Sequence, residues 1–149
     1  METGKLKIKI NDHESVTALL YPASKRLGVT VVLGHGAGAD QFSGFMRMTA
    51  EGLAARGLDV MTFNFLYKEQ GRGIPDPKAR LESCYLAVIK TALTHRKLKQ
   101  NRLVIGGKSM GGRIASQVAA VAPACIAGLV FLGYPCTRRA VPKKCAMSI

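Results

Sequence analysis

The chain has 149 residues, enough for one domain with a substantial core, and its 48% apolar content is that of an ordinary globular protein. Twenty-two Lys and Arg residues against nine Asp and Glu residues give a formal net charge of +13, which raises nucleic acid as a partner. No nucleic-acid-binding motif and no interleaved aromatic residues accompany this charge, so a solvated basic surface is favoured and no specific nucleic acid is expected.

Cysteine usage and hydropathy argue against a metal-binding, a disulfide-rich and a membrane-spanning protein. The four cysteines show no C-x-x-C spacing, so neither a metal site nor a disulfide framework is expected, and Cys84 and Cys125, among apolar neighbours, are predicted to lie in the core. Residues 114–137 carry no charge, but Pro123 divides them, which favours a helix and a buried strand over a membrane span. The N-terminus has no signal-peptide pattern, and a cytoplasmic location is expected.

The first half of the chain predicts a hairpin and two further strands. Apolar runs at residues 6–10 and 16–21 flank a turn-forming Asn-Asp-His-Glu cluster, as in a β-hairpin. The wholly apolar run 29–33 is typical of a strand buried on both faces. A helix is predicted over residues 43–56, with Gly57 as its C-terminal stop, and a strand over residues 59–65.

The second half of the chain continues the alternation of predicted strands and helices. Asp76 and Pro77 predict the N-cap and first turn of a long helix that reaches about residue 96. A strand at 103–106, a helix at 110–121 and a buried strand that begins at Ile126 and ends at Leu132 follow. Strands that alternate with helices predict an α/β fold, with a mostly parallel sheet flanked by helices.

Gly107-Lys108-Ser109-Met110-Gly111 reads G-x-S-x-G between a predicted strand and a predicted helix, the context of a nucleophile elbow. The serine of such a turn has a strained backbone, and glycines two residues to either side avoid collisions. Ser109 would begin the helix, where the Met110 N–H can stabilise an oxyanion. A phosphate-binding P-loop is excluded, because the glycine that it needs five residues before Gly107 is Arg102.

A second glycine-rich segment, Gly34-His35-Gly36-Ala37-Gly38, follows the predicted strand 29–33. Hydrolases with this elbow place their second oxyanion donor in such a loop. The alternative is a dinucleotide-binding loop, since Gly34-x-Gly36-x-x-Ala39 fits that fingerprint loosely. The next strand closes with Asn64 and Phe65 where the fingerprint requires an acidic residue, so the oxyanion loop ranks first and no cofactor is expected.

These segments carry a resemblance. Residues 106–113 (GGKSMGGR) and 33–37 (LGHGA), with Gly133-Tyr134-Pro135, resemble the α/β-hydrolase superfamily. They are most similar to the dienelactone-hydrolase-like family of the testis-expressed protein and the third NSL acetyltransferase-complex subunit. The resemblance, which runs from about residue 5 to residue 135, implies a serine hydrolase acting on an ester or similar small-molecule acyl substrate. Ser109 would be its nucleophile, with the backbone N–H groups of Ala37 and Met110 as oxyanion donors.

The chain departs from that family after the serine. No Asp, Glu or His follows Ser109, whereas the family expects first its acid and then its histidine there. None of His13, His35 and His95 is placed by the predicted topology to act as the base. We therefore expect a truncated hydrolase domain at residues 1–135, a basic tail at 136–149 outside the fold, a reading frame lost near residue 135, and impaired activity.

The alternative hypothesis is a non-catalytic interaction protein. In a sheet that lacks its last strands, the strand from Ile126 to Leu132 would be an apolar edge, and such edges pair with other chains. Self-association through this strand is therefore possible.

Overall fold

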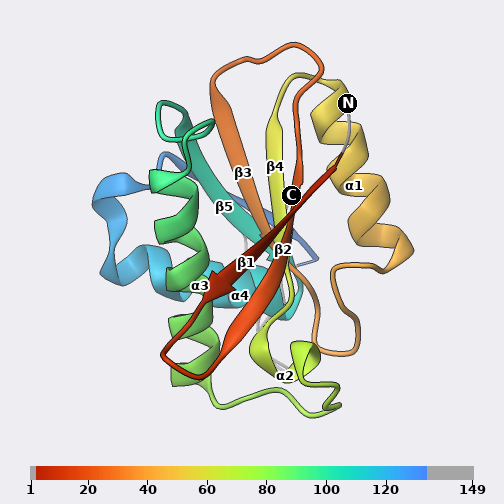
Figure 1. Ribbon diagram of the computed structural model, residues 1–149, viewed down its shortest axis with the longest axis vertical. Coiled ribbons are helices and arrows are strands. Elements are labelled where there is room, and N and C mark those ends of the chain that lie inside the picture. The colour runs from red at the N-terminus through yellow and green to blue at the C-terminus, as the bar shows by residue number, and fades with distance from the viewer. Residues whose placement is uncertain (1–2, 134–149) are drawn as a thin grey trace, which may run out of the picture.

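A computed structural model describes residues 3–133 as a six-stranded sheet with helices on both faces (Figure 1). The strands are β1 (Gly4–Lys9), β2 (Ser15–Tyr21), β3 (Val29–Gly34), β4 (Asp59–Phe63), β5 (Arg102–Lys108) and β6 (Gly128–Leu132). The helices are α1 (Gly44–Ala55), α2 (Leu66–Glu69), α3 (Lys78–Thr94), α4 (Met110–Val121) and the 3₁₀ turn η1 (Pro123–Cys125).

The strand order is β1-β2-β4-β3-β5-β6, and the predicted mostly parallel α/β sheet is confirmed. β1 and β2 form the predicted antiparallel hairpin, and β2 joins β4 in antiparallel register. The other pairs, β3 with β4, β3 with β5 and β5 with β6, are parallel. The chain leaves β3 for β4 on one side and returns to β5 on the other. The carboxyl ends of β3 and β5 therefore flank a topological switch point, where open α/β sheets bind ligands.

The two faces of the sheet bury separate cores. α1 covers one face, where Met46, Ala50 and Ala54 pack against apolar side chains of β2, β3 and β4. α3 and α4 cover the other face and contribute to the larger core (Figure 1). In that core Tyr85 of α3 lies fully buried, with its hydroxyl oxygen 2.6 Å from the Gly106 carbonyl oxygen and accepting the Gly106 N–H at 3.1 Å. Tyr85 thereby fixes α3 to the strand that leads to Ser109.

Asp59 stabilises the edge of the sheet at which β3, β4 and β5 begin. This buried carboxylate accepts the Ala23 N–H at 2.9 Å, the Asn101 side-chain amide at 2.9 Å and the Arg26 guanidinium at 2.8 Å. These partners lie in two loops, the one between β2 and β3 and the one before β5. Asp59 thus stabilises the end of the sheet that lies away from the carboxyl ends of β3 and β5.

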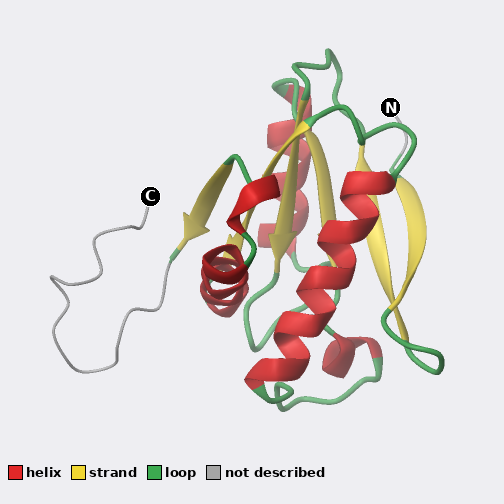
Figure 2. Ribbon diagram, turned by 90° about the vertical axis from the view of Figure 1, so that its left-hand side faces the viewer, coloured by secondary structure: helices red, strands yellow, loops and turns green. Residues whose placement is uncertain are grey.

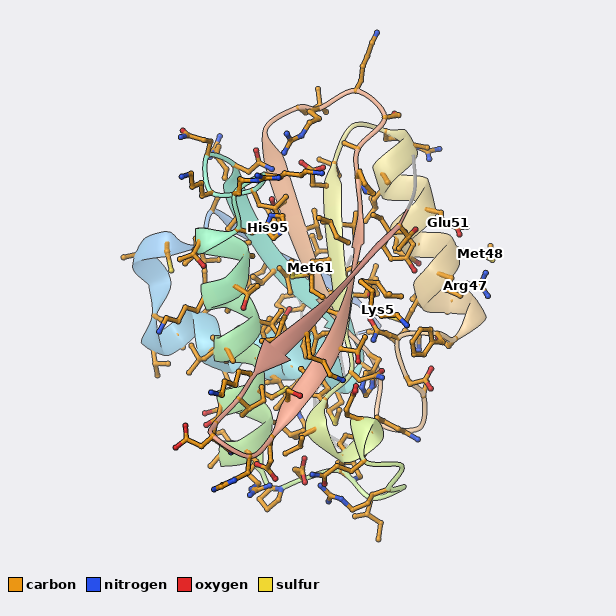
Figure 3. The ribbon with its side chains drawn as sticks, viewed as in Figure 1. Lys5, Arg47, Met48, Glu51, Met61 and His95 are labelled. Atoms are coloured by element: carbon orange, nitrogen blue, oxygen red, sulfur yellow. The ribbon has the colours of Figure 1, made fainter. Side chains whose placement is uncertain are left out.

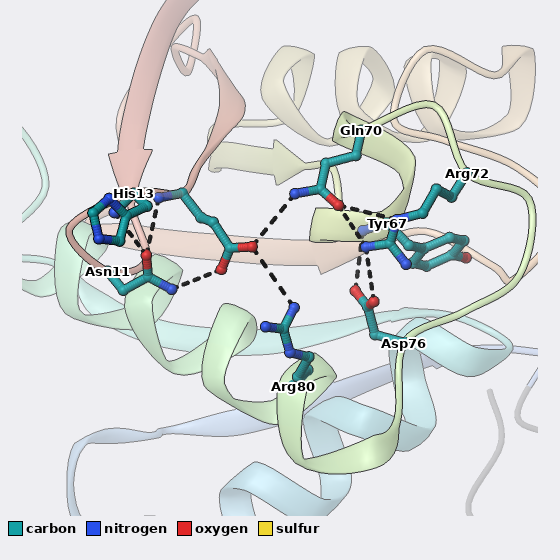
Figure 4. A network of polar contacts seen from close by, with 8 residues as sticks. Asn11, His13, Tyr67, Gln70, Arg72, Asp76 and Arg80 are labelled. Carbon is teal, nitrogen blue, oxygen red and sulfur yellow. Dashed lines mark hydrogen bonds and ion pairs between the residues drawn. The ribbon is translucent and has the colours of Figure 1, made fainter.

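Three local predictions differ from the structure. β4 ends at Phe63, two residues before the predicted end, because the chain turns into the short helix α2. Asp76 does not cap α3, whose N-cap position is Pro77. Its carboxylate instead accepts the Tyr67 N–H at 3.1 Å and pairs with Arg72 at 3.0 Å (Figure 4). Cys84 is buried as predicted, but Cys125 lies exposed in η1.

β6 forms one margin of the described sheet and begins at Gly128, two residues after the predicted start (Figure 2). Within residues 3–133 it pairs with β5 alone. The predicted tail at 136–149 and the Tyr134-Pro135 pair lie outside the described residues. Over the described part of the chain, no helix is long and apolar enough to cross a bilayer.

Candidate functional site

The turn between β5 and α4 holds Ser109 in a strained conformation. Its φ of 52° and ψ of −111° make it the one non-glycine residue with positive φ among residues 3–133. Such a conformation costs about 1–3 kcal/mol and persists only where the surroundings enforce it. Here the Ser109 N–H donates to the Leu132 carbonyl of β6 at 3.1 Å, and its own carbonyl accepts the Arg113 N–H at 3.0 Å. The turn is thus fixed between β6 and the first turn of α4.

Close packing against β3 explains the two glycines of the motif. A Cβ atom at Gly107 would lie 2.4 Å from the Gly34 carbonyl oxygen, and one at Gly111 would lie 2.2 Å from the same oxygen. Neither distance admits a side chain. The end of β3 therefore touches both sides of the Ser109 turn, which brings the loop after β3 alongside the serine.

His35 organises that loop. Its imidazole is fully buried, its Nε2 accepts the Phe65 N–H at 3.0 Å, and its Nδ1 lies 2.7 Å from the Gly36 carbonyl oxygen. Because Nε2 is an acceptor, Nδ1 carries the hydrogen and donates it to Gly36. The Gly36 carbonyl and the Ala37 N–H belong to one trans peptide and point in opposite directions. His35 therefore sets the direction of the Ala37 N–H.

Burial lowers the pKa of His35, because desolvation disfavours the imidazolium more than the nearby carbonyl favours it. The ring is therefore neutral near pH 7, and both of its nitrogens have partners. His35 has a positioning role in this arrangement and has no free nitrogen to take a proton from Ser109.

Tyr67 holds the other side of Ala37. Its hydroxyl donates to the Ala37 carbonyl at 2.7 Å, and its backbone N–H is held by Asp76. Burial raises the pKa of Tyr67 to about 12, so the hydroxyl keeps its hydrogen. Sequence reasoning missed Tyr67, because the contact joins α2 to a loop thirty positions earlier and no local pattern marks it.

Ala37, Ser109 and Met110, which the sequence predicts to act together, line one cavity of about 440 Å³. Helix α3 and the segment before it supply its other wall, with Pro75, Asp76 and Leu81. Within residues 3–133 neither the Ala37 N–H nor the Met110 N–H has a hydrogen-bond acceptor. Two unpaired backbone donors beside a serine are the parts that an oxyanion hole requires.

Ser109 also lines a second cavity, of about 450 Å³, between the loop after β3 and α1. Gly36 and Ala37 form one side of it, and Phe45 and Lys108 the other. The Lys108 ammonium lies over the Phe45 ring, 5.2 Å from its centroid. Ser109 thus stands between two cavities, each of a size that suits part of a small-molecule ligand.

No base reaches Ser109 within the described residues. Its hydroxyl has no hydrogen-bond partner in that part of the chain. His13 lies exposed in the turn of the β1–β2 hairpin, and His95 caps the far end of α3 (Figure 3). The sequence contains no Asp, Glu or His after Ser109. Residues 3–133 thus bring the serine and the backbone donors together without a proton acceptor from the same part of the chain.

Comparisons with known proteins agree with this architecture. The structure of an alpha-beta serine hydrolase homologue from Coxiella burnetii matches with a TM-score of 0.77 and 20% identity, over 93% of this chain and 66% of that one. A lidless serine hydrolase from Xanthomonas campestris gives 0.77 and 19% identity over 94% and 65% of the two chains. A dienelactone hydrolase from Anabaena variabilis gives 0.75 and 19% identity over 87% and 62%.

The chain therefore spans less than two thirds of the length of these solved structures. Comparison with curated proteins gives no significant match. A profile described as an alpha/beta hydrolase domain matches residues 28–147, which is most of the chain. With its sheet order, its strained serine and this match, the chain belongs to the alpha/beta hydrolase domain family.

Proposed function

We propose that this domain is an acyl hydrolase in which Ser109 attacks an ester carbonyl while the Ala37 and Met110 N–H groups hold the oxyanion. The observation that carries the proposal is the enforced strain at Ser109, which places its hydroxyl between two cavities and beside two backbone N–H groups. Among residues 3–133 neither the hydroxyl nor the two N–H groups have a hydrogen-bond partner. Strain of this kind is concentrated at catalytic turns. The substrate is a small ester or similar acyl compound.

The 149-residue chain is proposed to be impaired in proton transfer. A serine hydroxyl is a weak nucleophile without an adjacent base, and loss of triad members leaves about 10³–10⁴-fold catalysis over water, from binding and the oxyanion hole. Both acylation and hydrolysis of an acyl-enzyme need a proton acceptor. We therefore expect an acyl group on Ser109 to form slowly and to persist.

Exogenous imidazole tests both parts of this proposal. In the expected step, imidazole takes the Ser109 proton, the Oγ–carbonyl bond forms, and the bond to the 4-nitrophenolate leaving group breaks. Peptide mass mapping after incubation with 4-nitrophenyl acetate should locate an acetyl group on Ser109, in larger amount with imidazole than without it. Ser109→Ala is the control for acetylation of lysines.

An unmodified Ser109 with imidazole present would contradict the proposed nucleophile. Rapid turnover without imidazole that is lost in Ser109→Ala would instead contradict the proposed impairment. The two parts of the proposal are therefore tested separately.

A second candidate is a non-catalytic interaction protein, favoured by the position of β6 at the margin of the described sheet. Leu129, Val130 and Leu132 of this strand are only half-buried, and β5 is its one neighbouring strand among residues 3–133. This candidate predicts dimers formed through β6, visible by light scattering as a mass that rises with concentration. A constant monomer mass would contradict it.

A further inference from the structure

The cavity between α3 and α4 has a charge pattern that the proposed hydrolysis alone does not require. Besides the oxyanion residues, its wall contains Lys78 at the start of α3 and Arg113 in the first turn of α4. Its acidic residue is Asp76, whose carboxylate is already occupied by Arg72 and the Tyr67 N–H. Among the described lining residues, the cavity therefore presents positive charge that no carboxylate of the same lining neutralises.

Arg113 is the cation most available to a ligand. The Lys78 Nζ atom lies 3.7 Å from the Oε2 atom of Glu82, which is one turn further along α3. The Arg113 guanidinium has neither an ion pair nor a hydrogen bond within residues 3–133. A planar guanidinium binds a carboxylate through two parallel hydrogen bonds, so a carboxylate is the anion that this group recognises best.

Helix geometry aligns this cation with the nucleophile. Ser109, Arg113 and Gln117 follow one another at intervals of four residues, which places them on one face of α4, and all three line the cavity. Four residues of helix rise about 6 Å, so Arg113 stands one turn from the serine. The Gln117 Oε1 atom is buried without a hydrogen-bond partner in the described part of the chain.

The second cavity is less suited to an anion. Its cation, Lys108, already lies over the Phe45 ring.

The apolar residues Leu81 and Ile114 complete the lining of the first cavity and would contact a short hydrocarbon segment. The first cavity thus presents the proposed carbonyl site and a cation on α4, with apolar side chains from α3 and α4 in the same lining.

We propose that this cavity selects esters whose acyl part ends in a carboxylate, namely half-esters of short dicarboxylic acids, with Arg113 as the residue that binds the carboxylate. This inference rests on the proposed function of Ser109 and adds a substrate class to it. The spacing of one helical turn matches an acyl chain of glutarate length better than a long fatty chain.

Paired esters test this inference separately from the proposed function. Acylation of Ser109 in the presence of imidazole should be about tenfold faster with mono(4-nitrophenyl) glutarate than with the neutral 4-nitrophenyl butyrate, a preference expected of one charge-assisted contact. Arg113→Gln should remove the preference while retaining acylation by the butyrate. Arg47→Gln on the outer face of α1 (Figure 3), well away from the cavity, is the matched control and should keep the preference.

A second measurement needs no catalysis. Glutarate titrated into Ser109→Ala should shift the backbone amide resonances of residues 110–117, and the added change Arg113→Gln should abolish the shifts; a thermal melt checks that this variant is folded. Equal acylation by the two esters, or shifts that survive Arg113→Gln, would overturn the inference and leave Ser109 as the nucleophile. Absence of acylation by both esters would overturn the proposed function, and the titration would then decide the anion site alone.

Discussion

Replacing His35 by leucine removes two buried hydrogen bonds at similar side-chain volume. The Phe65 N–H and the Gly36 carbonyl, held at 3.0 Å and 2.7 Å, would be left without partners in a fully buried site. An unsatisfied buried polar group costs about 1–3 kcal/mol, so two groups cost about 2–6 kcal/mol. Native domains are stable by about 5–15 kcal/mol, and the loss would be a large fraction of the total.

Two amide variants separate the contributions of the two His35 hydrogen bonds to stability. His35→Asn can keep the bond to the Gly36 carbonyl, and His35→Gln can keep the bond to the Phe65 N–H, so each should lose about half as much as His35→Leu. Urea unfolding followed by circular dichroism measures the three differences. A His35→Leu variant within about 0.5 kcal/mol of the wild type, the range of neutral surface changes, would refute the positioning role of His35.

The pH dependence of stability supplies an independent check. Because the pKa of His35 is lowered in the folded state, the unfolded chain binds the extra proton first as the pH falls below about 6.5. Stability from neutral His35 is therefore complete above that pH and decreases below it, by at most about 1.4 kcal/mol per pH unit, until the folded pKa is reached. His35→Gln should lack this loss. Identical pH slopes in the two proteins would show that His35 is not held neutral.

Three further substitutions have expected outcomes. Gly111→Ala places a methyl group 2.2 Å from a β3 carbonyl oxygen and should lower the free energy of unfolding, measured in urea, by at least about 1–3 kcal/mol. Gly38→Ala is the control, because no atom lies within 4 Å of its new Cβ, and it should not cause this loss. Tyr85→Phe should lose about 1–3 kcal/mol by leaving Gly106 unsatisfied, and an unchanged urea midpoint would contradict this role. Asp59→Ala should lose about 1–3 kcal/mol, since it leaves the buried Ala23 N–H without its acceptor, and a melting temperature equal to that of the wild type would argue against it.

Features set by short segments of sequence were predicted well. The alternation of Lys with apolar residues determined the first strand, and the spacing of Gly107, Ser109 and Gly111 determined the strand–turn–helix context of the serine. The steric reason for those glycines also agrees with the structure, where both meet one carbonyl oxygen of β3.

Features that depend on distant partners were not predicted. The pattern at Asp76 is that of a helix cap, but in the folded chain Arg72 and the Tyr67 N–H compete successfully for its carboxylate. Cys125 has apolar sequence neighbours, yet it lies on an exposed 3₁₀ turn, since burial depends on what packs over a segment. Tyr67 and Tyr85 contact backbone carbonyls far away in sequence, and no local periodicity encodes such contacts.

The contact between Gly34 and Gly111 has a mechanical consequence. It leaves no room for the end of β3 to move closer to the first turn of α4, so the strand that leads to Ala37 and the helix that begins with Met110 are in direct backbone contact. The two proposed oxyanion donors therefore lie next to a backbone contact that is formed by the chain itself, with no ligand present. Any proton acceptor brought to Ser109, whether imidazole from solution or a side chain, would meet a serine whose proposed oxyanion donors are already beside it.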